Sequence, residues 1–353
     1  MLIFGKRMKV ALIHIRYIYK GGLETRLFNY IDYFINRGDE VHLFTSKISP
    51  DISPPANLHI HHLNLKRIPK PIRNFFFDKK LKQIIGLNEF DFILALERTS
   101  RQNHVIAPST HKGYLQAKGA KFSTIVDLVQ LYLDRKAFNN AKVIYACSKM
   151  VKDEIINLYR IAPNKVRVLH PPIKLSMFET STRDVSIRER NGWSKEDKIF
   201  LLVSTSHKRK GLDTLIAVFK ELPKNYKLLV AGTSFKSSNP QIVSLGFVKD
   251  MGAIYHQVDV LLHPAVYEPF GQIITEAFAA KVPVIISDRV GAKEFVNSNR
   301  GLVLDSLAPA VWYEAILKFD KEKISFEDIE EVLKELSLES HMEKMLNWAI
   351  FNK

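Results

Sequence analysis

The amino-acid sequence predicts an α/β protein with two successive doubly wound halves, each a parallel sheet with helices on both faces. Near-continuous apolar runs, which are typical of buried parallel strands, alternate with helical patterns along the chain. The alternation pauses once, at His170-Pro171-Pro172, and then starts again. The length of 353 residues suits two or three domains, each large enough to bury its own core.

The first half opens with the apolar run KVALIHI, which we expect to be a buried strand. After it, LETRLFNYIDYFINRG has apolar residues at helical spacing, and we expect Gly38 to end that helix. We expect later strands at EVHLFTS, DFILAL, HVIAPST, KFSTIVDL and KVIYACS. The resulting β-α-β rhythm favours a doubly wound sheet.

The second half repeats this rhythm. Four apolar strands are expected, at KIFLLVSTS, KLLVAGTS, DVLLHPA and KVPVIISD, with helical segments between them. We place the boundary near residues 170–176, with one domain over residues 1–172 and a second over residues 173–340. The final stretch, SHMEKMLNWAIFNK, has the pattern of an amphipathic helix.

The net positive charge of the chain lies in its first half. The net charge is +15, and residues 1–170 contain 28 Lys and Arg against 13 Asp and Glu, while the remaining residues contain 24 of each. Such an asymmetry points to an anionic partner of the first half: membrane lipid, a phosphorylated acceptor or nucleic acid. General solubility would not explain why only one half carries a net charge.

Other classes of protein are disfavoured by composition. The single cysteine, Cys147, excludes an internal disulfide and favours a reducing compartment. The first residues are interrupted by charges and do not resemble a signal peptide, and no segment approaches the roughly 20 apolar residues that span a bilayer. We therefore expect a cytoplasmic protein.

The most informative segment is AVYEPFGQIITEAFAA, which runs from Ala265 to Ala280. Glu268 is expected on a loop between a buried strand and a helix, and Glu276 about two turns along that helix. Backbone N–H groups of Phe270 and Gly271 would lie near the helix N-terminus, where anionic or hydroxyl-rich ligands bind. Two acceptors beside a row of donors suit a sugar nucleotide.

A basic loop follows the first strand of the second half. Arg209 and Lys210 stand in the run HKRKG, directly before a helix. Their charges would neutralise a diphosphate, and the helix dipole would add to the attraction. A solvated basic turn is the alternative interpretation.

The glutamate pair, with Phe-Gly after the first and Glu-Ala at the second, resembles the signature of retaining GT-B glycosyltransferases of family 4. This resemblance implies two Rossmann-like domains that face a cleft, with the donor in residues 173–340 and the acceptor in residues 1–172. It also implies that the C-terminal helix, residues 341–353, crosses back to the first domain. The implied activity is transfer of a sugar, most simply from a UDP-hexose, with retention of anomeric configuration.

The resemblance also implies roles for single residues of the second half. Glu276 would accept hydrogen bonds from ribose hydroxyls, and Glu268 would hold sugar hydroxyls. Lys210 matches the family's diphosphate-binding lysine. The family's usual arginine stands five residues earlier, where this chain has Thr205, so adjacent Arg209 is expected to replace it. Val248, in the run GFVKD, would lie beside the nucleotide base.

In the first half, Gly21 and Gly22 match a family Gly-Gly pair that lets backbone approach the donor phosphate. Glu24 fits the same pattern. His111 stands where the family often has a histidine or aspartate that faces the reacting carbon. Its alternative interpretation is an ordinary polar residue that lines the cleft.

No cofactor or metal is expected. The chain has no Asp-x-Asp sequence and no His/Cys cluster along the sequence, so Arg209, Lys210 and the helix dipole would have to stabilise the departing diphosphate. A front-face reaction, in which the leaving phosphate assists deprotonation of the acceptor, fits this set of residues better than a double displacement.

The segment LKRIPKPIRNFFFDKKLKQII combines dense positive charge with aromatic residues, which suits an anionic membrane surface. The alternative interpretation is that the phenylalanines pack in the core and the cations form a solvated face. No recognisable nucleic-acid motif accompanies the charge, so nucleic acid is not an expected partner. The residues expected to contact membrane or acceptor are Lys66, Arg67, Lys70, Arg73, Lys79 and Lys80.

The segments VLHPPI and RKGLDTLI are similar to lipopolysaccharide core glycosyltransferases, which implies a glycolipid acceptor at the inner face of the cell membrane. Two other classes stay open. A GT-B-type sugar-nucleotide epimerase would need no membrane acceptor, and a basic membrane or nucleic-acid binding module would leave the two glutamates without a role.

Overall fold

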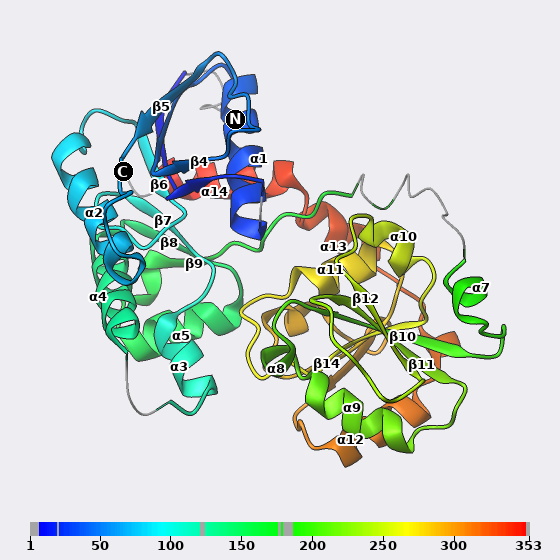
Figure 1. The fold of residues 1–353 in the computed structure, drawn as a ribbon. Helices are drawn as coiled ribbons and strands as arrows, with labels where there is room; N and C mark the ends of the chain where they lie inside the picture. Colours follow the sequence, from blue (N-terminus) through cyan, green and yellow to red (C-terminus); the bar gives the residue numbers. More distant parts are fainter. Residues whose placement is uncertain (1–6, 20, 121–123, 176–177, 179–185, 351–353) are drawn as a thin grey trace. The chain divides into compact units, whose positions relative to one another are not determined.

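A computed structural model describes residues 7–19, 21–120, 124–175, 178 and 186–350. The chain forms two compact units: unit 1, which comprises Met1–Pro171 and His341–Lys353, and unit 2, which comprises Pro172–Ser340. Each unit contains one large parallel sheet with helices packed around it (Figure 1), so the predicted pair of doubly wound halves is confirmed. The first three residues of KFSTIVDL and the last three of the chain lie outside the described residues.

Unit 1 contains a seven-stranded sheet in the order β5-β3-β1-β6-β7-β8-β9, and all its neighbouring strands are parallel. A short two-stranded ribbon, β2 with β4, lies beside it. The strands are β1 (Lys9–Ile13), β2 (Arg16–Tyr17), β3 (Glu40–Thr45), β4 (Lys47–Ile48), β5 (Leu58–His62), β6 (Phe92–Ala95), β7 (His104–Ala107), β8 (Val143–Ala146) and β9 (Val166–Val168).

The helices of unit 1 bury the apolar face that the sequence pattern predicts. In α1, for example, Leu27, Tyr30 and Phe34 are fully buried. The helices are α1 (Gly22–Asn36), η1 (Lys70–Ile72), α2 (Arg73–Ile84), α3 (His111–Ala117), α4 (Ile125–Asn140), α5 (Lys149–Tyr159) and η2 (Pro163–Lys165).

One predicted strand is wrong. From Thr124 onward, the segment KFSTIVDL forms the start of α4 rather than a strand. The hydroxyl of Thr124 accepts a hydrogen bond from the backbone N–H of Asp127, and the Asp127 carboxylate accepts one from the N–H of Thr124. This capping box starts a helix in spite of the β-branched residues that suggested a strand. Ile125, Val126 and Leu128 are exposed, so they form no buried strand.

Unit 2 contains a six-stranded parallel sheet in the order β12-β11-β10-β13-β14-β15. Its strands are β10 (Lys198–Ser204), β11 (Tyr226–Gly232), β12 (Ile242–Gly246), β13 (Val260–His263), β14 (Val284–Ser287) and β15 (Gly301–Leu304). Its helices are α7 (Ile187–Asn191), α8 (His207–Lys210), α9 (Leu212–Glu221), α10 (Met251–Tyr255), α11 (Gln272–Ala279), η3 (Gly291–Phe295), α12 (Pro309–Lys318), η4 (Lys321–Lys323) and α13 (Ile329–Glu335).

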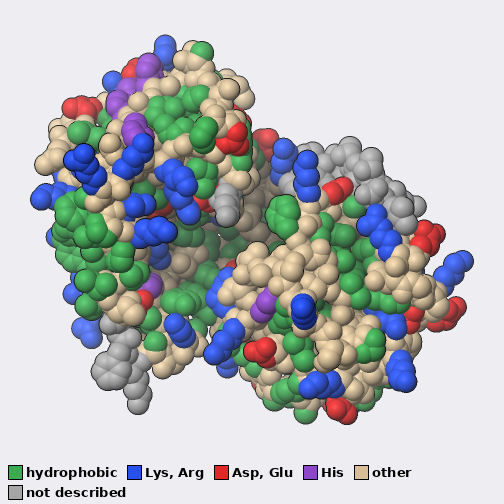
Figure 2. Space-filling view, in the orientation of Figure 1, with side chains coloured by type: hydrophobic (Ala, Val, Ile, Leu, Met, Phe, Trp, Pro, Cys, Tyr) green, Lys and Arg blue, Asp and Glu red, His purple; other side chains and the backbone are tan. Residues whose placement is uncertain are grey.

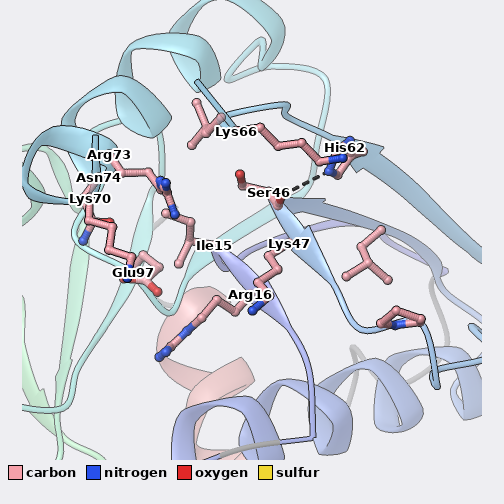
Figure 3. Close-up of a pocket in the computed structure, with 13 residues that line it drawn as sticks. Ile15, Arg16, Ser46, Lys47, His62, Lys66, Lys70, Arg73, Asn74 and Glu97 are labelled. Atoms are coloured by element: carbon pink, nitrogen blue, oxygen red, sulfur yellow. Dashed lines mark hydrogen bonds between the residues drawn. The ribbon is translucent and has the colours of Figure 1, made fainter. Parts of the chain in front are cut away.

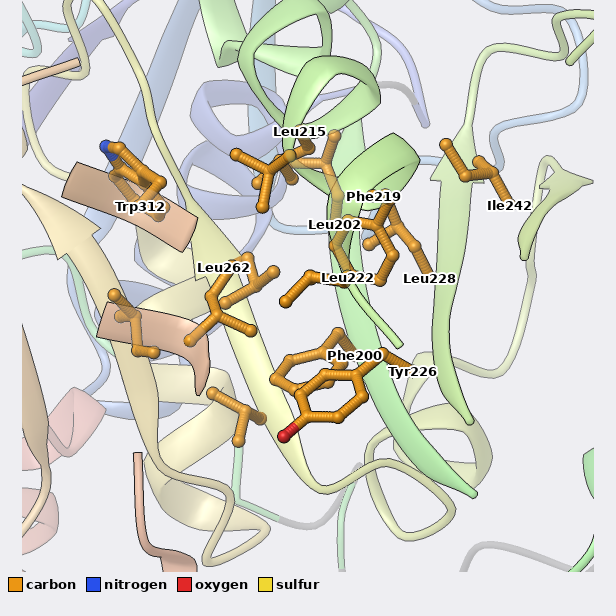
Figure 4. Close-up of a cluster of buried hydrophobic side chains, with 14 of the residues drawn as sticks. Phe200, Leu202, Leu215, Phe219, Leu222, Tyr226, Leu228, Ile242, Leu262 and Trp312 are labelled. Carbon is orange, nitrogen blue, oxygen red and sulfur yellow. The ribbon is translucent and has the colours of Figure 1, made fainter. Parts of the chain in front are cut away.

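One cluster of buried apolar side chains in unit 2 lies between its sheet and the helices α9 and α12 (Figure 4). Phe200 and Tyr226 stack on neighbouring strands, with their ring centroids 5.6 Å apart. Trp312 of α12 is fully buried, and its indole N–H donates to the carbonyl of Ser306. This packing holds the strand ends, and therefore the loops that follow them, in fixed positions.

The last helix, α14 (Leu338–Ile350), joins the two units by sequence and packs in unit 1 from His341 onward. His341 lies 2.6 Å from the hydroxyl of Tyr30, and the hydroxyl of Tyr145 donates to the carbonyl of Met345. Within the described residues, no helix is both long enough and apolar enough to cross a bilayer.

Candidate functional site

The candidate site of unit 2 lies where the order of its strands reverses. β10 is followed in the chain by β11 and β12 on one side, while β13 lies on its other side. In open parallel sheets, ligands bind outside the carboxyl ends of the two strands that flank such a switch point. Arg209 and Lys210 lie in the short helix α8 that follows β10, and Glu268 lies in the loop after β13.

The structure brings these three predicted residues together. The ammonium group of Lys210 donates a hydrogen bond to Glu268 Oε2, and Arg209 Nη1 lies 3.1 Å from the same oxygen. Arg209 also donates to the carbonyl of Tyr267. Lys210 and Glu268 are largely buried, whereas the Arg209 side chain is one-third exposed. Arg209 is therefore the cation of this cluster that solvent and ligands reach most easily.

The cluster is charged at neutral pH. Burial acts to raise the pKa of Glu268, but neighbouring His263 and Lys210 outweigh burial and hold that pKa well below its ordinary value. For His263, burial dominates and lowers the pKa to about 4, so this imidazole is neutral. Burial also lowers the pKa of Lys210, against the attraction of Glu268. With Lys210 paired, Arg209 supplies the excess positive charge.

Gly211 fixes the basic loop against the end of β13. Its φ is +76°, and a Cβ at this position would lie 2.0 Å from the carbonyl oxygen of Pro264. Only glycine allows this approach. The backbone N–H of Val266 also donates to the carbonyl of Arg209. The two loops of the site are thus joined through their backbones as well as through Lys210 and Glu268.

Glu276 lies on α11, which begins at Gln272 with Gly271 as its N-cap. Gly271 has φ +92°, and no side chain caps the helix, which leaves its first turn available to an anion. Glu276 is the fifth residue of the helix, so it lies just over one turn along it rather than the predicted two. The hydroxyl of Tyr255 donates to its carboxylate at 3.0 Å, and burial raises the pKa of Glu276.

Two further residues of unit 2 were predicted to belong to this site. The Phe270 side chain is buried and packs edge-on against Phe295, so Phe270 can offer a ligand only its backbone. Val248 follows β12 in a loop and is partly buried, beside the strongly exposed Phe247. No described contact joins Val248 to Glu276 or Lys210.

In unit 1, the predicted glycine pair begins α1. Gly21 is the N-cap, with φ +104°, and Gly22 is the first helical residue. Glu24 is buried in the first turn, where its carboxylate pairs with Arg16 at 2.6 Å. A ligand could therefore approach the backbone at Gly21 closely. The carboxylate of Glu24, however, is already paired with Arg16.

A buried histidine that the sequence did not reveal joins this region. His14, directly after β1, is fully buried and lies 3.1 Å from Glu97 and 3.7 Å from Glu24. Burial alone would lower the pKa of His14, but the two carboxylates outweigh it and raise the pKa to about 9. His14 is thus a buried cation at neutral pH. A histidine at the end of an apolar strand was the available signal.

His111 begins α3 and is held by two aspartates of α4. Its Nε2 lies 2.8 Å from Asp127, and its backbone N–H donates to Asp134. The same Asp134 carboxylate also accepts hydrogen bonds from Arg98 and from the hydroxyl of Tyr159. His111 therefore lies beside a network of polar side chains. His111 is partly buried, so both its predicted catalytic role and the alternative of polar lining stay open.

The predicted basic surface separates into two groups. Lys66, Lys70 and Arg73 line a pocket of about 920 Å³ in unit 1, together with Arg16, Lys47 and Glu97 among others (Figure 3). The other three predicted residues do not line that pocket: Arg67 and Lys79 are exposed, and Lys80 donates to the carbonyl of Asn64. Arg16 and Lys47 were not predicted, because they lie far from the basic segment in sequence.

A cluster with metal-ligand chemistry also forms in unit 1, although no such cluster was expected from the sequence. His42 and His59 are direct partners on β3 and β5, and Glu40 lies two residues before His42. One ligand atom from each of these three side chains lies within 4.8 Å of the others. The pairing of two strands creates this cluster, and it belongs to the other unit from Lys210 and Glu268.

Two family models and several curated proteins match this chain. Residues 20–176 match the Glycosyltransferase Family 4 model, and residues 185–335 match the model of Glycosyl transferases group 1. A probable transglycosylase of Burkholderia thailandensis is 25% identical over 81% of this chain and 79% of its own. The lipopolysaccharide glucosyltransferase WaaG of Escherichia coli is 21% identical over 84% of this chain and 85% of its own.

Solved structures show the same fold. The crystal structure of WaaG, a glycosyltransferase involved in lipopolysaccharide biosynthesis, has a TM-score of 0.76 with 18% identity, over 95% of this chain and 98% of that one. Anabaena HepE in complex with UDP and glucose has a TM-score of 0.68 with 16% identity, over 97% of this chain and 99% of that one.

Proposed function

Because the chain belongs to the GT-B glycosyltransferases of family 4 and resembles the lipopolysaccharide core enzymes, we propose that it moves a hexose from UDP-hexose to a membrane glycolipid. The transfer retains the anomeric configuration of the sugar. The observation that carries this proposal is the cluster of Arg209, Lys210 and Glu268 at the switch point of unit 2.

The donor is held by unit 2. Arg209 and the uncapped first turn of α11 attract the diphosphate, and Glu276 accepts hydrogen bonds from the ribose hydroxyls. Both cations contact Oε2 of Glu268, so Oε1 is placed to accept a sugar hydroxyl. Val248 and the backbone of Phe270 border the base and the sugar. The similar HepE structure contains UDP and glucose, which supports this choice of ligand.

In the reaction, the bond between the anomeric carbon and the diphosphate oxygen breaks while the acceptor oxygen bonds to the same face of that carbon. The acceptor proton passes to the departing phosphate oxygen. Arg209 and Lys210 stabilise the charge that develops on this leaving group, without a metal or other cofactor. Within unit 1, we propose that the backbone at Gly21 and Gly22 binds a phosphate and that His111 contacts a sugar.

The anomeric configuration of the product tests this function. UDP-glucose labelled with 13C at the anomeric carbon, incubated with a lipopolysaccharide-core acceptor and EDTA and followed by NMR, is expected to yield UDP and an α-configured glycoside of the acceptor. Appearance of β-configured sugar would contradict retention, and loss of turnover in EDTA would contradict a metal-free reaction. Isomerisation of the sugar nucleotide without transfer would favour an epimerase instead.

UDP binding is expected to weaken as the pH falls. Because burial raises the pKa of Glu276, its carboxylate takes up a proton at a higher pH than an exposed glutamate does. The protonated acid accepts hydrogen bonds from ribose hydroxyls less well than the carboxylate. Calorimetric titration with UDP between about pH 5 and 8 should show this loss of affinity. The Glu276→Gln variant should bind more weakly at pH 8 and lack this slope, and an unchanged slope would contradict the role.

We propose that unit 1 binds the membrane that contains the glycolipid acceptor. Ile125, Leu128 and Tyr132 of α4 are exposed, and the ring of Tyr132 lies beside exposed Phe75 of α2. Figure 2 shows apolar side chains gathered among Lys and Arg on this unit. Apolar side chains surrounded by cations are typical of proteins that bind the surface of an anionic membrane. This surface supports our proposal that the enzyme acts at the inner face of the cell membrane.

Replacing Ile125 and Leu128 by serine is expected to weaken binding to phosphatidylglycerol-containing vesicles by about tenfold or more, because burying one such side chain contributes roughly 1.5–3 kcal/mol. Vesicle sedimentation measures the effect. Leu317→Ser, an exposed leucine of unit 2, is the control and should bind vesicles normally. Equal binding by all three proteins would place the membrane surface elsewhere.

A further inference from the structure

The pocket of unit 1 lies at the switch point of its sheet (Figure 3). Its lining comes from the residues that follow β1, β3, β5 and β6, which are neighbours in the order β5-β3-β1-β6. The strand order reverses between β1 and β6, and Arg16 and Glu97 follow these two strands. This is the position where open parallel sheets bind ligands. The volume of about 920 Å³ is in the range of sites for small organic molecules.

The charge of this pocket is strongly unbalanced. Its lining contains the five cations Arg16, Lys47, Lys66, Lys70 and Arg73 but a single carboxylate, that of Glu97. Arg16 is paired with Glu24. Within the described residues, Lys47, Lys66 and Lys70 have no ion pair, and Arg73 donates to the carbonyl of Ile68. Four cations thus lack an acidic partner, and a ligand with several negative charges would supply one.

Glu97 gives the pocket one acceptor of hydrogen bonds. The Glu97 side chain is 16% exposed, and its Oε1 lies 3.1 Å from Nδ1 of His14. Because His14 is fully buried, this pairing fixes the carboxylate at the wall of the pocket. A carboxylate repels phosphate but binds hydroxyl groups well. The wall therefore suits a ligand that carries both negative charge and hydroxyls.

We propose that this pocket binds a phosphate-bearing sugar, with its phosphate held by Lys47, Lys66 and Lys70 and a hydroxyl held by Glu97. The proposal rests on the proposed function and identifies the group of the acceptor that unit 1 recognises. Simple electrostatic attraction of an anionic surface would need the cations alone, without a fixed carboxylate among them.

Binding of glucose 6-phosphate, glucose and pyrophosphate to the whole protein tests the proposal, with UDP present to occupy unit 2. Glucose 6-phosphate is expected to bind at least tenfold more tightly than glucose. The variant Lys66→Gln/Lys70→Gln should lose this preference. Glu97→Gln should weaken glucose 6-phosphate but not pyrophosphate, since it removes a hydroxyl acceptor and a repelling charge. All variants should bind UDP normally.

The matched control is Lys118→Gln/Lys142→Gln, which removes two exposed cations outside the pocket. If this control loses the preference for glucose 6-phosphate to the same extent, the effect is general electrostatic attraction and the proposal is overturned. Tighter binding of dihexanoyl phosphatidylglycerol than of glucose 6-phosphate would overturn the assignment to a sugar in favour of a lipid headgroup. Absence of sugar phosphate binding alongside normal UDP binding would overturn this inference but leave the proposed function intact.

Discussion

Replacing Lys210 by alanine is expected to lower the rate of sugar transfer by about 10²–10³-fold, because fixed charges at a leaving group commonly contribute that much to catalysis. Lys210 also anchors Glu268, so the variant loses both a stabilising charge and a fixed sugar contact. Steady-state kinetics with UDP-glucose should show the loss mainly in kcat, since charge develops on the diphosphate only in the transition state.

Lys208→Ala is the control for this experiment. Lys208 is exposed on the same short helix, α8, and has no described contact with Glu268. It should retain nearly full activity. If the two variants lose activity equally, the cluster of Lys210 and Glu268 has no special role, and the basic loop acts only through its total charge.

Gly211→Ala is expected to disrupt unit 2 and its ligand site together. A non-glycine residue in this left-handed conformation costs about 1–3 kcal/mol, and the new Cβ would overlap the Pro264 carbonyl. The loop after β10 must then move away from β13, which separates Lys210 from Glu268. Thermal unfolding should show a lower Tm, and UDP binding should be lost even where the protein stays folded.

The control for this substitution is Gly192→Ala. Gly192 also has a positive φ, +64°, but a Cβ there would meet nothing within 4 Å. This variant should show only the modest effect of backbone strain and bind UDP normally. Similar effects at both positions would mean that the close contact between Gly211 and Pro264 does not position the site.

The fold and the unit 2 site were predictable from the sequence because their signals are local. Buried parallel strands appear as apolar runs, as in β10 and β13. Arg209, Lys210 and Glu268 each stand within six residues of the end of such a strand. The rule that parallel strands end at one edge of the sheet therefore places them near each other. Lys210 and Glu268 are 58 residues apart, yet strand order brings them into contact.

The unit 1 pocket was not predictable in the same way. Arg16, Lys47 and Glu97 follow three different strands, and no local pattern reveals that β3, β1 and β6 are neighbours. The burial of His14 against two carboxylates has the same origin. At α4, local propensity was misleading, because the capping box at Thr124 and the packing of buried Leu133 and Phe138 outweigh the β-branched residues at its start.

The most direct test of the proposed function is the thermal stability of the protein with UDP or GDP, beside the Glu276→Ala variant. A nucleotide at 100-fold its Kd should stabilise the folded protein by roughly 2.7 kcal/mol. We expect UDP to raise the Tm of the natural protein and to leave that of the variant almost unchanged. Equal stabilisation of both proteins by UDP would remove Glu276 from the site, and no stabilisation by either nucleotide would contradict the glycosyltransferase proposal.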